Sequence, residues 1–270
     1  MQLATLPLVL AVVLLELATG GAFLIWALDR TKQAPLGFLK LTAGTDAACG
    51  ILAFLLLPAL PRGSLAESAQ LHPAALDSLA LAVTVLAVLL VAQLLTTFVP
   101  WRTLRAVVSL VTILVGGATL LAAAVARPGD QQYNVFALAA LPLGAIALGG
   151  VDAAMLLGHW YLVTPKLSPL PLQRASLIVV AAIVLQGVVV AVTVAHGELV
   201  GALDTSSLAV AIGIRIGVGI VMTLALVVAA WWTARMNTQS STGLLYVGLG
   251  TALAGEVAAR VLFYLTGVPI

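Results

Sequence analysis

The sequence predicts an all-α integral membrane protein with eight transmembrane helices. Of its 270 residues, 62% are hydrophobic and only 8% are charged, whereas soluble domains carry about 25% charged residues. Eight separate apolar runs are each long enough to cross roughly 30 Å of hydrocarbon, which takes about 20 residues of helix. Because lipid offers no hydrogen-bond partners, each run must satisfy its backbone groups internally, as an α-helix does.

The spans are expected at residues 4–28, 37–60, 76–99, 105–126, 135–164, 174–196, 206–233 and 242–266. In chain order the breaks between them read DRTKQAP, PRGSLAESAQLHP, PWRTLR, RPGDQQYN, TPKLSPLPLQR, HGELVGALDTSS and MNTQSS. Proline, glycine and charged residues end each helix there, and no break can hold a folded extramembrane domain. The first run contains Glu16 and follows no basic segment, so we expect a retained span and not a cleaved signal.

Basic residues gather in alternate breaks. Eight Lys and Arg residues lie in the odd-numbered breaks or within a few residues of them: Arg30, Lys32, Lys40, Arg102, Arg105, Lys166, Arg174 and Arg235. The even-numbered breaks hold only Arg62 and Arg127, and the sixth has Glu198 and Asp204 without a base. Short loops rich in Lys and Arg face the cytoplasm. We therefore expect a multi-pass protein of the inner (cytoplasmic) membrane with both termini on the non-cytoplasmic side.

An internal repeat is indicated when the chain is shifted by 136 residues. Glu16 then aligns with Asp152, Arg30 with Lys166, and the Pro-Leu pair at 35–36 with the pair at 171–172. Four spans separate the copies, so both halves would enter the membrane in the same orientation. This predicts two four-helix bundles, residues 1–130 and 131–270.

Ionisable residues inside the spans are the strongest functional signal. Each costs about 2.5 to 3.5 kcal/mol if it meets lipid alone, so each must face the bundle interior, water or a partner. The predicted spans contain Glu16, Asp46, Asp152, Arg215, Glu256 and Arg260. Four carboxylates against two guanidinium groups leave two acids that need a proton, water or a bound cation.

The last span spaces Glu256, Arg260 and Tyr264 by four residues each, which puts them on one helix face. They could form an ion-pair staple, with Arg215 as a further partner, or a polar pocket that handles protons or a quinone. Asp152 and His159 also share a face, but about 10 Å along the axis separates them and excludes a catalytic dyad within this helix. Asp152 is expected to be paired with an arginine or protonated, whereas His159 is expected at the inner interface.

The sequence disfavours several cofactors and partners. His72, His159 and His196 are expected at different membrane depths, which argues against bis-histidine haem ligation. The single Cys49 excludes an intramolecular disulfide and an iron–sulfur cluster built by this chain alone. We find no nucleotide-binding or hydrolase motif and no basic stripe suited to nucleic acid.

The closing sequence GEVAARVLFYLTGVPI resembles the last span of the membrane-anchor subunits of respiratory molybdoenzymes, the DMSO reductase anchor and the NrfD/polysulfide reductase type. Those anchor subunits have eight spans, two four-helix bundles, no haem and a quinol site that passes electrons to an iron–sulfur partner subunit. The first three features match what the sequence predicts for this chain. The resemblance implies that Glu256, Arg260 and Tyr264 lie near a quinol site.

Three functions therefore remain open. The first is a quinol- or quinone-interacting subunit of a respiratory electron-transfer complex, with an iron–sulfur or cytochrome partner and with Asp152, His159, Glu256 and Arg260 handling protons. The second is a proton- or cation-coupled small-molecule transporter, in which midplane carboxylates are the coupling sites. The third is a membrane assembly or scaffold protein whose buried charges only specify helix pairing.

Overall fold

The computed structural model describes residues 5–129, 134–164, 167–196 and 206–270. All regular secondary structure in these residues is helical, and eight helices are long and apolar enough to cross a membrane. The predicted fold class, an all-α multi-pass membrane protein with eight spans, is confirmed. Lys166, Glu198 and Asp204, which entered the orientation argument, lie outside the described residues.

The spans begin and end within a few residues of the predicted positions. They are α1 (Leu6–Asp29), α2 (Leu36–Leu55) with the 3-10 turn η1 (Leu57–Ala59), α4 (Pro73–Thr96), α5 (Arg102–Val125), α6 (Val135–Val163), α7 (Leu170–Ala195), a seventh span made of α8 (Ser206–Gly213), the π-helical η3 (Ile214–Met222) and α9 (Thr223–Thr233), and α10 (Thr238–Thr266). A five-residue helix, α3 (Ser64–Ser68), lies between α2 and α4.

Local sequence explains where two starts depart from the prediction. Helix α7 begins four residues early because Pro171 sits in its first turn, where a missing N–H costs nothing. Helix α10 also begins four residues early, because the side chain of Asn237 accepts hydrogen bonds from the backbone N–H groups of Gln239 and Ser240. At the far end of α10, Gly267 adopts φ +74°, the left-handed conformation that ends many helices.

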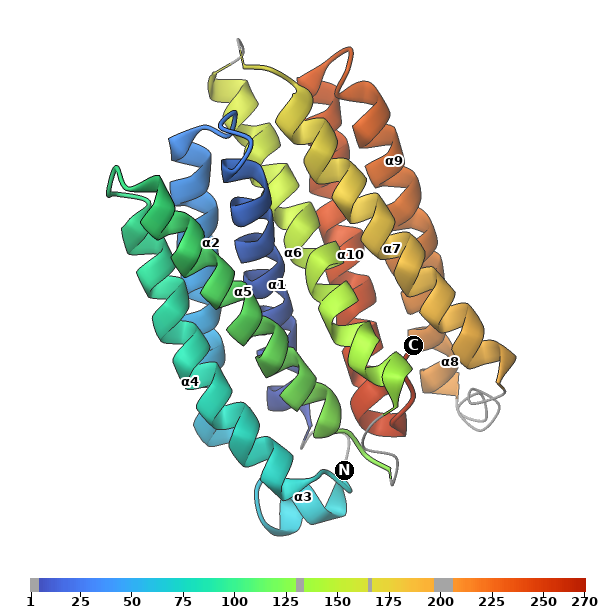
Figure 1. The fold of residues 1–270 in the computed structure, drawn as a ribbon. Helices are drawn as coiled ribbons and strands as arrows, with labels where there is room; N and C mark the ends of the chain where they lie inside the picture. Colours follow the sequence, from blue (N-terminus) through green and yellow to red (C-terminus); the bar gives the residue numbers. More distant parts are fainter. Residues whose placement is uncertain (1–4, 130–133, 165–166, 197–205) are drawn as a thin grey trace.

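The helices form two neighbouring groups (Figure 1). Helices α1, α2, α4 and α5 contact one another in a ring, and α6, α7, the seventh span and α10 do the same. The two groups meet mainly along α1 and α6. The outer helices turn apolar side chains outward, and Leu81, Val88 and Leu114 are each more than 60% exposed. Such a surface suits lipid and not water.

Paired glycines allow α1 and α6 to approach closely. An ideal Cβ on Gly20 would lie 1.8 Å from the backbone oxygen of Ala145, and one on Gly149 would lie 2.3 Å from that of Leu17. Only hydrogen fits at these two positions, which is the usual role of small residues between membrane helices. At this crossing Gly20 of α1 lies against Gly149 of α6, an offset of 129 residues. The 136-residue shift that aligns Glu16 with Asp152 therefore does not describe which residues face each other across the α1–α6 contact. The internal repeat and the division near residue 130 stay predictions.

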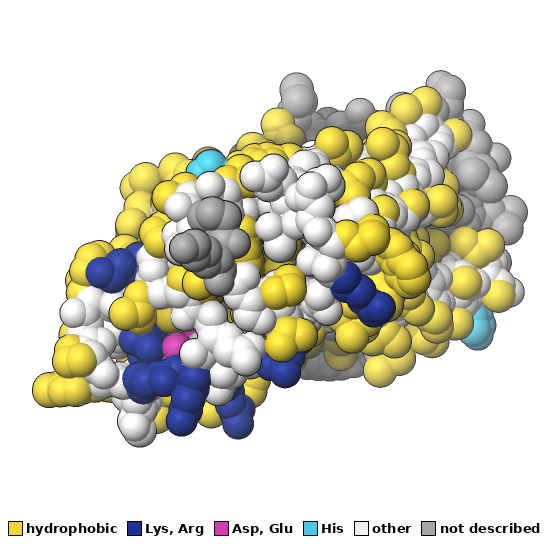
Figure 2. Space-filling view, turned by 90° about the horizontal axis from the view of Figure 1, so that it is seen from above, with side chains coloured by type: hydrophobic (Ala, Val, Ile, Leu, Met, Phe, Trp, Pro, Cys, Tyr) yellow, Lys and Arg dark blue, Asp and Glu magenta, His cyan; other side chains and the backbone are white. Residues whose placement is uncertain are grey.

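The two ends of the bundle differ in charge. The connections after α1, α4, α6 and α9 lie at one end, which we call the basic end; α1 begins and α10 ends at the other, which we call the terminal end (Figure 1). Viewed onto the basic end, Figure 2 shows Lys and Arg side chains gathered around an acidic side chain at one side of the molecule. That the basic end faces the cytoplasm stays a prediction.

Candidate functional site: two groups of buried carboxylates

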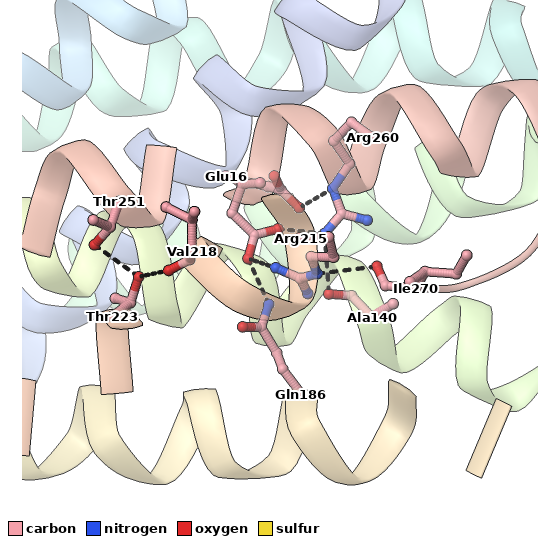
Figure 3. A network of polar contacts seen from close by, with 10 residues as sticks. Glu16, Ala140, Gln186, Arg215, Val218, Thr223, Thr251, Arg260 and Ile270 are labelled. Atoms are coloured by element: carbon pink, nitrogen blue, oxygen red, sulfur yellow. Dashed lines mark hydrogen bonds and ion pairs between the residues drawn. The ribbon is translucent and has the colours of Figure 1, made fainter. Parts of the chain in front are cut away.

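Four helical segments bring an ion-pair network together inside the protein (Figure 3). Glu256 on α10 accepts hydrogen bonds on Oε1 from Arg215 Nη1 at 2.8 Å and from Gln186 Nε2 at 2.7 Å. Its other oxygen, Oε2, accepts one from Arg260 Nη2 at 2.8 Å, one helical turn away. Arg260 Nε lies 2.9 Å from Glu16 Oε1 on α1. The network therefore joins α1, α7, η3 and α10.

The network is buried, and its acidic and basic groups are equal in number. Its five side chains are each no more than 2% exposed, and two carboxylates face two guanidinium groups. Two donors also reach main-chain oxygens, Arg215 Nε that of Ile270 at 3.2 Å and Arg260 Nη2 that of Ala140 at 3.4 Å, whereas Glu16 Oε2 has no hydrogen-bond partner. Breaking such a buried pair from one side is strongly destabilising. These contacts suit a fixed structural core that ties the two helix groups together.

The π-helical segment η3 places Arg215 beside Glu256. The hydroxyl of Thr223 lies 3.0 Å from the main-chain oxygen of Val218, five residues earlier, and 2.8 Å from the hydroxyl of Thr251 (Figure 3). An ideal Cβ on Gly219 would lie 2.5 Å from Cα of Gly255, so these two backbones touch. Widened turns of this kind often occur at functional sites. Close backbone contact fixes the distance across which Arg215 reaches Glu256.

A second group consists of Asp46 and Asp152. Asp46 on α2 is fully buried, and its carboxylate lies against α1, where a Cβ on Gly21 would be 2.0 Å from Oδ1. Asp152 on α6 is 5% exposed. The two carboxylates are close enough to interact electrostatically with each other and with the thiol of Cys49. They come from both helix groups, Asp46 from α2 and Asp152 from α6.

These two aspartates are the acids left without a counter-charge. Both oxygens of Asp46 and Oδ2 of Asp152 are buried without a hydrogen-bond partner. Within the described residues, no Lys, Arg or His lies within ion-pair distance of either carboxylate. Two like charges in a low-dielectric interior repel strongly, and each also loses its hydration. A proton, water or a bound cation must therefore compensate the charge of this pair.

The remaining two predicted site residues lie apart from both groups. His159 is exposed near the basic end, where its Nδ1 lies 2.8 Å from the hydroxyl of Tyr246. Tyr264 is buried and donates its hydroxyl hydrogen to the main-chain oxygen of Ala123 at 2.8 Å. The eight residues predicted from sequence are thus divided into a four-residue ion-pair network, an aspartate pair and two separate aromatic side chains.

Sequence reasoning missed several polar partners. Gln186 is the only strongly polar side chain in the middle of α7, and this isolation in an apolar run was the signal that could have revealed it. Asp29 and Arg105 form a two-pronged ion pair, with Nε to Oδ2 at 2.8 Å and Nη2 to Oδ1 at 3.1 Å. Both residues belong to breaks between the predicted spans, and the sequence gives no sign that they pair.

The ion-pair network offers a quinone few free groups. Glu256 and Arg260 direct their polar atoms at each other, at Glu16 and at Arg215. Tyr264 lines a cavity of about 530 Å³ at the terminal end, together with polar residues that include Glu67, Ser68 and Gln70. A quinone head group needs hydrogen-bond donors beside an apolar slot, and Tyr264 brings one hydroxyl to this cavity.

Comparison with known proteins adds no further assignment, since no protein-family model, no curated protein and no solved structure matches this chain.

Proposed function

We propose that this protein is a proton- or cation-coupled membrane transporter in which Asp46 and Asp152 form the coupling site. The observation that carries the proposal is the buried, unpaired state of these two carboxylates. A coupling site must bind and release a positive charge within the membrane. Carboxylates already held by arginines, as in the Glu256 network, cannot do so without breaking their ion pairs.

The position of the pair supports the proposal. Asp46 is ten residues from the start of α2 and Asp152 eleven residues from the end of α6, which places both about 15 Å below the basic end. That depth is about half of the roughly 30 Å hydrocarbon layer. Coupling ions in secondary transporters bind at this midplane, between structural halves that move relative to each other.

The chemistry requires one charge to come and go. With one proton on the pair, a single negative charge remains, and the repulsion between two like charges is relieved. A second proton, or a cation of the same charge, makes the site neutral. Loss of that charge to one side of the membrane and its recovery from the other would complete a cycle without any covalent intermediate.

Infrared spectroscopy of the full-length protein in lipid tests the protonated state without knowledge of the substrate. We expect a protonated-carboxyl band that shifts in deuterated buffer and disappears in both Asp46→Asn and Asp152→Asn. Asp77→Asn, which removes an exposed carboxyl on α4, is the matched control and should leave the band unchanged. Persistence of the same band in both variants would overturn the assignment.

Proteoliposomes test the transport itself. A potassium gradient with valinomycin supplies a membrane potential, and a pH-sensitive dye reports proton entry. We expect wild-type protein to carry a proton flux that Asp46→Asn and Asp152→Asn both remove and Asp77→Asn retains. Equal flux in wild-type and double-variant vesicles would count against proton coupling, and sodium flux with the same dependence would identify a cation as the coupling ion.

A second proposal keeps the quinol-interacting subunit implied by the resemblance of the last span. The cavity lined by Tyr264 at the terminal end supports it. On this proposal, protein purified from its native membrane carries quinone and an iron–sulfur or cytochrome subunit. Tyr264→Phe should then weaken quinone binding, whereas Asp77→Asn should not. Purification of the protein without quinone and without a redox partner would reject this function.

A further inference from the structure

A cavity of about 500 Å³ opens at the basic end of the first helix group. It lies between the α1–α2 connection and the start of α5, where Figure 2 shows Lys and Arg side chains gathered. Its polar lining consists of Asp29, Lys32, Lys40, Thr97, Arg102 and Arg105. It is separate from the aspartate pair and from the Glu256 network, and neither proposed function uses it.

The cavity carries a surplus of positive charge. Asp29 is its single carboxylate, and the buried Arg105 occupies both of its oxygens. Arg102 donates to the main-chain oxygen of Asp29 at 3.0 Å, lies 3.5 Å from its Oδ1 and keeps a side chain that is 48% exposed. Four cationic side chains therefore face one carboxylate, which leaves a surplus of three positive charges.

Two helix N-termini add to the positive electrostatic potential of the cavity. The first residues of α2 and α5, Leu36 and Arg102, both line the cavity. Neither helix has a side-chain cap or an acidic residue in its first turn. Unpaired N–H groups and the positive end of the helix dipole at such a terminus attract anions. The side chains and the backbone thus favour the same kind of ligand.

One wall of the cavity is apolar and borders the lipid-facing surface. Leu36 is 55% exposed and Phe98 is 64% exposed. The ammonium group of Lys40 lies 4.5 Å from the centre of the Phe98 ring, at the border between this wall and the cationic lining. A ligand that matches both parts has an anionic head and an apolar tail.

We propose that this cavity binds the phosphate headgroup of an anionic phospholipid, with the acyl chains lying along Leu36 and Phe98. Lys32, Lys40 and Arg102 would contact the phosphate oxygens. Asp29 and Arg105 are positioning residues, because their ion pair holds Arg102 and the α1–α2 connection in place. Basic residues that only determine membrane orientation need neither a cavity nor an apolar wall. The presence of both distinguishes a specific lipid-binding site from the overall positive charge of the basic end.

Equilibrium binding to the full-length protein in neutral detergent tests the site. The probes are fluorescent phosphatidylglycerol and, for comparison, fluorescent phosphatidylcholine, which has the same phosphate but no net charge. Each basic residue near an anionic headgroup is worth about fivefold in affinity. We expect Lys40→Gln and Arg102→Gln each to weaken phosphatidylglycerol binding about fivefold, and the double variant about 25-fold.

Arg174→Gln is the matched control, since Arg174 is an exposed base on α7 at the same end that does not line the cavity. It should leave binding unchanged. Lys32→Gln provides a second exposed substitution in case Arg102→Gln disturbs folding, which gel filtration would reveal. Equal binding of the two lipids, or equal effects of Arg174→Gln and Lys40→Gln, would overturn the proposal. Complete displacement by millimolar inorganic phosphate would also overturn it, in favour of a site for a free anion.

Discussion

Arg260 is the residue that links the two helix groups through charge. Its guanidinium contacts Glu16 on α1 and Glu256 on its own helix. We expect Arg260→Gln to lower the free energy of unfolding by about 3 to 5 kcal/mol, because it leaves Glu16 buried without a counter-charge. Thermal unfolding in detergent, followed by loss of helical circular dichroism, measures the change.

The double variant Glu16→Gln, Arg260→Gln is the informative comparison. It removes the stranded carboxylate, while Arg215 still neutralises Glu256. We therefore expect the double variant to be more stable than Arg260→Gln alone. If the two have the same midpoint, the Glu16 carboxylate is not held by Arg260, and the charge assignment of the network is wrong.

Single residues of the candidate site could be predicted from sequence because an ionisable group in hydrocarbon is costly wherever it points. Glu16, Asp46 and Glu256 were recognisable for that reason. Their partners were not recognisable. Helical periodicity tells which residues of one helix lie on the same face. It does not tell which neighbouring helix that face contacts. The separation of Asp46 from all arginines is therefore visible only in the structure.

At the scale of elements, the contact between α1 and α6 depends on glycine. Gly149→Ala places a methyl group within 2.3 Å of a backbone oxygen, so α6 must move away from α1. We expect a loss of about 1 to 3 kcal/mol, the usual cost of overpacking. The thermal midpoint in detergent is again the measurement.

Gly117→Ala on α5 is the control for that substitution. An added Cβ there meets nothing within 4 Å. Alanine is a better helix former than glycine, so stability should stay the same or rise slightly. If Gly117→Ala destabilises the protein as much as Gly149→Ala, the close approach of α1 and α6 is not what makes glycine necessary.

Helix positions could be predicted from sequence to within about four residues because lipid demands long uninterrupted apolar runs. The exact starts of α7 and α10 depended on Pro171 and on the cap from Asn237, which act locally and outweigh hydropathy. The π-helical segment was not predicted. Within it, Gly219 packs against the backbone of Gly255 on α10, and the sequence of one span does not tell which helix lies opposite.

At the scale of the whole molecule, the charge difference between the two ends leads to a topology prediction. Eight apolar spans require the connections after α1, α4, α6 and α9 to lie on one side, and positive charge predicts that this side is the cytoplasm. On a Cys49→Ser background, Leu65→Cys should react with a membrane-impermeant maleimide in intact cells. Met236→Cys should react only after permeabilisation. Both side chains are well exposed, so the opposite pattern would reverse the orientation.

The two helix groups are joined by polar contacts as well as by α1 and α6. Glu16 meets Arg260, Tyr264 donates to the main chain at Ala123, and Arg127 donates to the main-chain oxygen of Gly267 at 2.5 Å. Each contact pairs a residue before position 130 with one after it. Each half contains its own ring of four helices. Alone, however, each half would expose the apolar, glycine-lined face of α1 or α6 together with charged groups that have lost their partners.

This arrangement predicts how a split protein behaves. When residues 1–130 and 131–270 are expressed together as separate chains, we expect them to assemble and co-purify through the α1–α6 interface. Expressed singly, each half should be degraded or aggregate, because a buried carboxylate or guanidinium loses its partner. Arg260→Gln in the second half should reduce the co-purified fraction, and Arg174→Gln should not. Two halves that are each stable alone and do not associate would show that the groups fold as independent bundles, and that the ion pair between them contributes little.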